Sequence, residues 1–379
     1  MIKIIALIAW ILVLLVSTSA SQTKKEGPVQ HLLKSLLAND EVSIDSVKRF
    51  FIVGDFGDLT AREDLDQVTD AMNKLASKNK YDFIATVGDN VYENGIESMD
   101  KLDDVKDIMT YFKKPNIKKM PMFLTLGNHD WVSDIQNSID FSKVDEQWNM
   151  DEDFYELKYP LKDDPSKSFV LLMANSCKLA CLNDVKDSDN SEFDCGDMNV
   201  KVGEDKVIAH YDWVEEKLAK HTADPDVAWL GVVMHHPLFI EPSMKQDFLP
   251  ILMKYKVDFA MVGHKHMFEY ANMDFDGEIK FPGKAFGDII DDWTDKDEII
   301  NSESRTQVFN KGEKFHQFLI GGSGRKLKDI CPYKEQDGDV YFQNVQKHGM
   351  VTIEVESNYF NVKYLNSKQE IIYDVTITE

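Results

Sequence analysis

Seven apolar runs recur along the chain, and each contains the β-branched or aromatic residues that favour strands. The runs are apolar almost without interruption, a pattern typical of strands buried on both faces of a sheet. They occupy residues 49–55, 81–89, 121–130, 168–176, 229–236, 258–266 and 316–324. The pattern therefore predicts a sheet whose strands lie in the interior of the fold.

Amphipathic helices are predicted between these runs. Apolar residues repeat at helical spacing over residues 65–75, which places them on one helix face. Thr60 and Glu63 precede them with the spacing of a capping box. Similar patterns predict a second helix after Ser98 and a third over residues 208–221.

The end of the chain returns to strands, which we predict at residues 350–356, 359–365 and 370–377. No linker rich in Pro, Gly or Ser divides the alternating elements. We therefore predict an α/β fold with a single domain over residues 48–379, preceded by a polar leader at residues 21–47.

The chain is acidic, with 43 Lys and Arg residues against 66 Asp and Glu residues and a net charge of −23. It contains no basic cluster, and such a surface repels nucleic acid, so we expect no nucleic-acid partner. Residues 274–314 are acidic and have a weak apolar pattern. We interpret them as a solvated insertion loop of the domain, with a lid as one role open to it.

The N-terminus has the layout of a signal peptide over residues 1–20. Lys3 supplies a positive charge, an apolar run extends from Ile4 to Val16, and Thr18–Ala20 offer small residues for cleavage. The run is shorter than the roughly 20 residues of a membrane span. We expect a monomer of the secretory pathway, secreted or lysosomal/vacuolar, without a stable membrane span after cleavage. An uncleaved signal anchor is the alternative.

The four cysteines are Cys177, Cys181, Cys195 and Cys331. In a secreted chain an even number predicts two disulfides, and three pairings are open. Three of the four lie in one polar segment, which predicts a stapled surface loop. The spacing fits no familiar zinc motif.

Residues of metal-ligand type end five of the seven apolar runs. In open α/β sheets, ligands bind just outside the carboxyl ends of the strands, so we expect these side chains to converge. Taken singly, a Gly-Asp pair is an ordinary turn and a histidine is more often structural. Taken together they favour a metal site, because five of the ten histidines lie at these strand ends. The residues are Asp55, Asp89, Asn128, His129, Asp130, His235, His236, His264 and His266.

The ordered motifs resemble those of the binuclear metallophosphoesterases and, among them, the purple acid phosphatases of the small, tartrate-resistant type. The resemblance runs from about Arg49 to the C-terminal strands. It implies an α/β/β/α sandwich with the metal site at the C-terminal ends of the strands. The motifs are GDFG (54–57), GDNVY (88–92), GNHD (127–130), VVMHH (232–236), GHKH (263–266) and a Gly-rich turn, GGSG (321–324).

The resemblance also implies which residues hold the metals. Asp55, Tyr92 and His266 would hold Fe(III), and Asn128, His235 and His264 would hold a divalent ion, either Fe, Zn or Mn. Asp89 would bridge the two ions. Mixed oxygen and nitrogen donors suit these metals better than calcium. A phenol ionises near neutral pH only when a strong Lewis acid binds it, so Tyr92 favours Fe(III).

The expected activity is that of an acid phosphatase acting on phosphomonoesters. Two ions about 3.5–4 Å apart can hold the attacking and leaving oxygens of an in-line displacement, with a metal-bound hydroxide as nucleophile. His129 would stabilise charge and donate a proton to the leaving oxygen. Asp130 would either orient His129 or cap a helix. We expect an acid pH optimum.

One departure from the family pattern concerns a second active-site histidine. Related enzymes have one several residues after the equivalent of His235, whereas residues 237–247 contain none. His236 and Glu241 are the candidates for its role, and the absence puts the turnover rate in doubt.

Two other functions remain open. The chain could be a scaffold, as are the glideosome-associated anchor proteins that share this fold. It could also be a phosphodiesterase or protein phosphatase of the same superfamily. The second is disfavoured, because those enzymes usually have a histidine where Gly57 stands, and this chain has Tyr92 instead.

Overall fold

The computed structural model describes residues 44–180, 193–194, 201–202, 204–277, 298–300, 304–327 and 339–379. Ile44–Glu379 form one compact unit. The predicted signal peptide and the first part of the leader, up to residue 43, lie outside the described residues. Among the residues that are described, no helix has both the length and the apolar character to cross a membrane.

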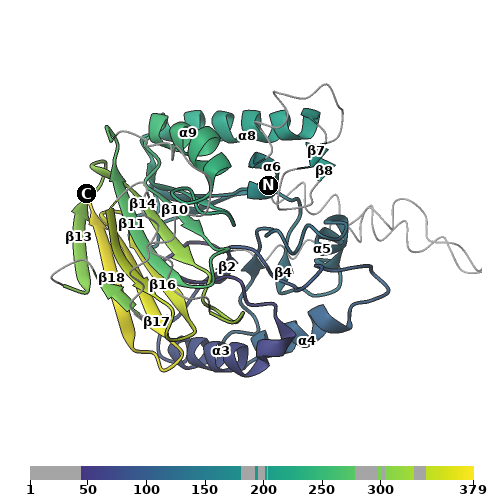
Figure 1. The fold of residues 1–379 in the computed structure, drawn as a ribbon. Coiled ribbons are helices and arrows are strands. Elements are labelled where there is room, and N and C mark those ends of the chain that lie inside the picture. The colour runs from purple at the N-terminus through teal and green to yellow at the C-terminus, as the bar shows by residue number, and fades with distance from the viewer. Residues whose placement is uncertain are drawn as a thin grey trace, which may run out of the picture. The chain divides into compact units, whose positions relative to one another are not determined.

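Two mixed eight-stranded sheets contain most of the described strands (Figure 1). The first has the order β13 (Thr306–Asn310), β18 (Ile371–Thr378), β17 (Tyr359–Asn366), β16 (Gly349–Glu356), β1 (Arg49–Val53), β2 (Phe83–Thr86), β3 (Met122–Phe123) and β4 (Trp148–Asn149). The second has the order β12 (Glu298–Ile300), β15 (Asp339–Asn344), β11 (Phe268–Asp274), β14 (Lys314–Ile320), β10 (Phe259–Val262), β9 (Val227–Val233), β6 (Ser168–Met173) and β5 (Tyr155–Pro160). A short ribbon pairs β7 (Phe193–Asp194) with β8 (Lys201–Val202).

The strands that carry the motifs are parallel to their neighbours. In the first sheet β1, β2, β3 and β4 run in parallel. In the second sheet β6, β9, β10 and β14 do the same. Parallel strands end at the same edge of a sheet, so each sheet brings its motif loops together at one edge.

Three apolar clusters define the layers. Aromatic residues of both sheets fill the space between them, as when Phe50 stacks on Phe83 and Phe259 stacks on Phe360. The outer face of the first sheet packs against α3 (Arg62–Ala76), α4 (Asp103–Phe112) and α5 (Gln136–Phe141). The outer face of the second packs against α6 (Ser176–Leu179), α8 (Glu204–Thr222), η3 (Met244–Phe248) and α9 (Leu249–Lys254). The predicted α/β/β/α sandwich is confirmed.

The capping box at Thr60 and Glu63 was a wrong prediction. The Asp58 carboxylate instead accepts the Thr60 N–H at 2.8 Å and caps a short 3-10 turn, η1 (Leu59–Ala61). Helix α3 continues from that turn, and its N-cap residue Ala61 makes no side-chain capping bond. The side-chain cap is therefore supplied by Asp58, in the turn after β1, and not by Thr60.

The acidic segment 274–314 is not the simple loop that its composition predicts. Its described parts include β12, antiparallel to β15, and β13, parallel to β18. Both are edge strands, and the side chains of β13 are partly or fully exposed along its length, which explains the weak apolar pattern. Residues 278–297 and 301–303 lie outside the described residues.

Cys177 is buried in α6. Cys181, Cys195 and Cys331 lie outside the described residues, so the disulfides stay a prediction.

Candidate metal centre

Asp55 lies two residues after the end of β1 and Asp89 three residues after the end of β2, in equivalent turns. Both have a φ of 54°, a left-handed conformation that aspartate tolerates better than most residues. The Asp55 N–H donates to the Gly88 carbonyl at 3.0 Å, which holds the two turns together. Both carboxylates are buried.

The first ligand cluster forms around these carboxylates. Asp55, Asp89 and His266 each offer a ligand atom within 4.8 Å of the other two. The Tyr92 hydroxyl joins them, 2.7 Å from Asp89 Oδ2, 3.3 Å from Asp55 Oδ1 and 3.5 Å from His266 Nε2. The structure thus brings together the four residues predicted to hold or bridge the ferric ion.

The second ligand cluster lies on the other side of Asp89. Asn128 Oδ1 is 3.1 Å from His235 Nε2 and 2.9 Å from His264 Nδ1. Asp89 Oδ1 is 3.4 Å from His235 Nε2, while its other oxygen faces Tyr92. Asp89 therefore presents one oxygen to each cluster, which is the geometry that a bridging carboxylate requires.

Backbone carbonyls orient two of the imidazoles. His235 Nδ1 donates to the Val87 carbonyl at 2.8 Å, and His266 Nδ1 donates to the Lys326 carbonyl at 3.1 Å. With Nδ1 protonated, the Nε2 lone pair of each ring faces its cluster. Burial lowers the pKa of His235, which keeps the ring neutral and able to bind a cation.

The donor set fits two cations. Buried carboxylates are costly without a positive partner, and here two of them converge with a phenol. Burial, with the carboxylates of Asp55 and Asp89, raises the pKa of Tyr92 well above its ordinary value. The phenol therefore stays neutral and donates to Asp89 unless a cation binds at this point.

His129 lies at the edge of both clusters. Its N–H donates to Asp89 Oδ1 at 3.0 Å, its Nδ1 donates to the Glu93 carbonyl at 2.8 Å, and its ring contacts that of Tyr92 at 4.3 Å between centroids. The side chain is partly exposed.

Neither predicted role of Asp130 is what its bonds show. The buried carboxylate accepts N–H bonds from Gly127 at 2.8 Å and from Asn90 and Val91 at 3.1 Å, so it joins the loops after β2 and β3. Burial and the nearby Asp89 raise the pKa of Asp130 to about 7, and the three N–H donors act in the opposite direction.

The two candidates for the missing histidine both lie beside His264: His236 offers a ring nitrogen within 4.8 Å of those of His235 and His264, and Glu241 Oε1 is 3.6 Å from His264 Nε2. His236 is buried, its Nδ1 is 2.8 Å from the Ser176 hydroxyl, and its ring lies 4.7 Å from that of His264. Glu241 Oε1 contacts Lys265 Nζ at 2.7 Å. Neither is among the described residues that line the pocket.

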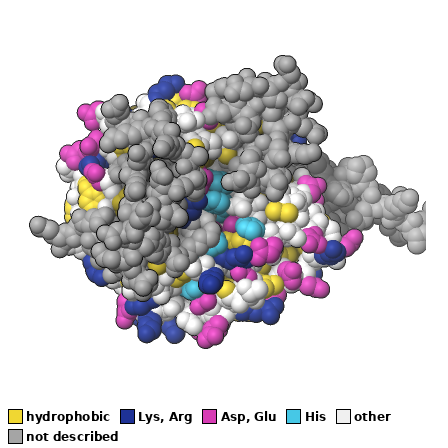
Figure 2. All heavy atoms as spheres, viewed as in Figure 1, with side chains coloured by type: hydrophobic (Ala, Val, Ile, Leu, Met, Phe, Trp, Pro, Cys, Tyr) yellow, Lys and Arg dark blue, Asp and Glu magenta, His cyan; other side chains and the backbone are white. Residues whose placement is uncertain are grey.

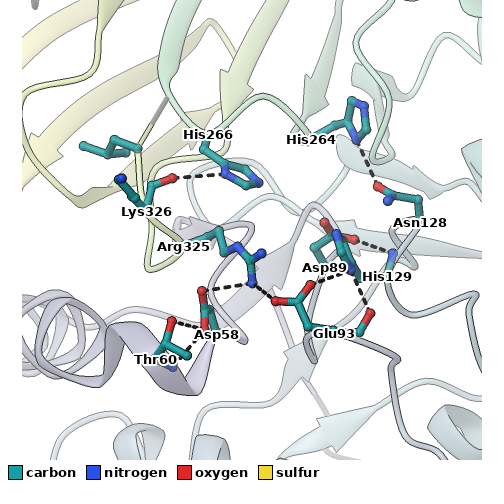
Figure 3. A pocket seen from close by; sticks show the side chains of 11 residues that line it. Asp58, Thr60, Asp89, Glu93, Asn128, His129, His264, His266, Arg325 and Lys326 are labelled. Atoms are coloured by element: carbon teal, nitrogen blue, oxygen red, sulfur yellow. Dashed lines mark hydrogen bonds and ion pairs between the residues drawn. The ribbon is translucent and has the colours of Figure 1, made fainter. Parts of the chain in front are cut away.

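A pocket of about 700 Å³ opens above the clusters, and histidine side chains gather at the middle of this face (Figure 2). Its wall includes His129 and also Asp58, Glu93, Arg325 and Lys326 (Figure 3). Arg325 and Lys326 follow the GGSG turn after β14.

Sequence reasoning missed several residues that support the site. Ser176 follows β6, and its hydroxyl accepts the N–H groups of His235 at 3.2 Å and His236 at 3.0 Å. Its position after a buried strand could have marked it as a site residue, but serines are common in such loops for reasons unrelated to a site. The Gly-rich turn at residues 321–324 could have marked the following Arg325 as a site residue.

Gly57 is packed so tightly that no side chain fits. A Cβ there would lie 2.0 Å from the Asn90 carbonyl oxygen, and the Gly57 carbonyl accepts the Tyr92 N–H at 3.1 Å. We expect Gly57→Ala to lower the free energy of unfolding by about 1–3 kcal/mol, because the loop that carries Tyr92 must shift. Denaturant unfolding measures the change. Val132→Ala, at an exposed position, is the control, and equal stability of the two variants would contradict the prediction.

Comparisons with known proteins agree with this geometry. Residues 48–268, more than half of the chain, match the family Calcineurin-like phosphoesterase. Tartrate-resistant acid phosphatase type 5 of Oryctolagus cuniculus is 24% identical over 240 residues, which cover 59% of this chain and 68% of the relative.

Solved structures show the same fold. GAP50, the anchor in the inner membrane complex of Plasmodium, superposes with a TM-score of 0.61 at 16% identity and covers 86% of this chain and 87% of its own. The purple acid phosphatase PPD1 of yellow lupin (Lupinus luteus) has a TM-score of 0.55 at 17% identity, with 88% and 54% covered. The predicted family resemblance is confirmed, and the chain belongs to the calcineurin-like phosphoesterase family.

Proposed function

We propose that the protein is an acid phosphatase that hydrolyses phosphomonoesters at a binuclear centre of Fe(III) and a divalent ion. The observation that carries the proposal is Asp89, which presents one oxygen to each of two ligand clusters beneath a single pocket. Tyr92 in the first cluster supports Fe(III) there. The similarity to tartrate-resistant acid phosphatase supports the monoester as substrate class.

The seven ligands would be Asp55, Tyr92 and His266 for the first ion, Asn128, His235 and His264 for the second, and Asp89 for both. When bound, the ions would hold the substrate phosphate and supply the activated water for an in-line displacement.

His129 would hold and transfer the proton. Its Nδ1–H is held by the Glu93 carbonyl, so in the doubly protonated ring the Nε2–H is the proton that passes to the leaving oxygen, and the neutral Nδ1–H ring remains. The His129 ring contacts the Tyr92 ring, and the His129 backbone N–H donates to Asp89. These two contacts fix the position of His129 relative to both clusters.

Wild-type protein is expected to hydrolyse p-nitrophenyl phosphate, and His235→Ala is expected to abolish hydrolysis and to lose the divalent ion. Turnover, elemental analysis and thermal unfolding are measured together. His221→Gln in α8, outside the pocket, is the control that keeps both activity and metal. Full activity in His235→Ala would refute the assignment.

The second candidate is a scaffold of the same fold, favoured by the GAP50 likeness and by the lack of a histidine in residues 237–247. Wild-type protein that holds two metals yet hydrolyses no phosphomonoester would support it. Location in the secretory pathway, as a secreted or lysosomal/vacuolar protein, is proposed on residues 1–20 alone.

A further inference from the structure

We propose that Arg325 forms a subsite for a second anionic group of the substrate, so that the pocket selects phosphomonoesters bearing a carboxylate or a further phosphate. The inference rests on the proposed phosphatase function and narrows its substrate class. It starts from the pocket wall rather than from the ligand clusters (Figure 3).

The backbone fixes Arg325 beside the first ligand cluster. Its N–H donates to the Asp55 carbonyl at 2.7 Å, and its own carbonyl accepts a bond from His348 Nε2 at 2.9 Å. The guanidinium lies over the Tyr92 ring, 4.4 Å from the centroid. The planar Arg325 cation is therefore held on the face of the Tyr92 ring, next to the ligand cluster where the substrate phosphate would bind.

The two carboxylates that pair with Arg325 differ in burial. Asp58 Oδ2 is 3.0 Å from Nη1, and Asp58 is buried and also bonded to Thr60. Glu93 contacts the same nitrogen, but its side chain is 58% exposed. The Asp58 pair is therefore the better shielded from water. The Glu93 pair contributes little to stability, because water screens exposed ion pairs.

Glu93 thus occupies a position that a substrate anion can take. Guanidinium has five donors in a planar fork that matches a carboxylate or phosphate, and Asp58 and Glu93 both contact the same nitrogen. An incoming anion would displace the exposed Glu93 carboxylate and keep Asp58 as the anchor.

The pocket wall has few positively charged side chains besides Arg325. Among the described residues that line the pocket, Asp58, Asp89 and Glu93 are acidic, and only Arg325 and Lys326 are Lys or Arg. The chain as a whole carries −23. The acidic residues of this wall would repel a second anion on the substrate, and Arg325, whose guanidinium lies over Tyr92, is a cation placed to receive it.

The test compares substrates that differ only in charge. The pairs are 3- and 4-carboxyphenyl phosphate, each with its uncharged carbamoyl isostere, and the readout is the ratio of kcat/KM values, carboxylate over carbamoyl. In Arg325→Met we expect this ratio to fall by about 10- to 100-fold, the worth of a charge-assisted hydrogen bond. In Glu93→Gln we expect it to rise by about 2- to 5-fold, because an exposed competing pair is lost.

Arg62→Gln is the matched control, since Arg62 pairs with Asp107 and does not line the pocket. It removes the same charge and should leave the ratio as in wild type. A ratio unchanged in Arg325→Met, or lowered as much in Arg62→Gln, overturns the subsite. If wild-type protein hydrolyses neither pair, the phosphatase assignment has failed. The subsite is then decided by calorimetric binding of the same compounds, and equal affinity for both members of each pair overturns it.

Discussion

Asp89→Asn is expected to remove both metal ions and to lower kcat/KM for p-nitrophenyl phosphate by about 10³-fold or more, since even one lost stabilising group costs about 10²–10³. Asparagine keeps the shape of the side chain but loses the charge that two cations would share. Asp89 reaches Tyr92 with one oxygen and His235 with the other, so one substitution affects both clusters. Elemental analysis and steady-state kinetics measure the two losses.

Asp258→Asn is the matched control for this prediction. Asp258 is also buried, and its Oδ2 accepts the Leu230 N–H at 2.9 Å, but it precedes β10 and so lies at the end of that strand opposite to His264. The amide oxygen of asparagine can keep that bond. The control should retain both ions and wild-type turnover. Two full equivalents of metal in Asp89→Asn would contradict the bridging role.

Tyr92→Phe is expected to abolish the visible absorption band of the metal-loaded protein. In the proposed centre the band would come from a tyrosinate bound to Fe(III), and phenylalanine keeps the ring while removing the oxygen. Asp55, Asp89 and His266 remain, so part of the iron should still bind. The expected result is a protein that contains iron but has lost its colour, measured by absorption spectroscopy and elemental analysis.

Metal removal gives an independent check on the same residue. Since burial and two carboxylates raise the pKa of Tyr92, the phenol of the metal-free protein stays protonated and colourless. Chelation should bleach the wild type as completely as the substitution does. Tyr81→Phe, which alters a buried tyrosine stacked on Phe51, is the control and should keep the band. A band of equal strength in Tyr92→Phe would show that the colour has another source.

The local pattern predicted the strands well, because strands buried in a sheet are made of nearly continuous apolar residues. The runs ending at Asp55, Asp89 and His235 correspond to β1, β2 and β9, and each strand ends within three residues of its candidate ligand. The helix after Ser98 begins at Asp103, and the helix expected over residues 208–221 extends from Glu204 to Thr222. Boundaries shifted because caps depend on neighbours that periodicity does not reveal.

The roles of polar residues around the site were harder to predict. Asp130 follows His129 in the chain, yet its carboxylate binds N–H groups of the loop after β2. His236 follows His235, yet its ring is buried beside Ser176. In each case the buried side chain bonds to a group that the tertiary fold brings beside it. The neighbouring residue in the sequence does not determine that partner.

By itself the sequence determined the α/β class, the order of the strands along the chain and the residues that gather at their ends. It could do so because apolar periodicity and ligand types are local, and parallel strands end at one edge. Only the tertiary structure decided that Asp89 faces two clusters, that Gly57 has no space for a side chain, and that Arg325 lies over Tyr92. Those facts depend on contacts between residues more than 30 positions apart, and no local pattern of the chain encodes them.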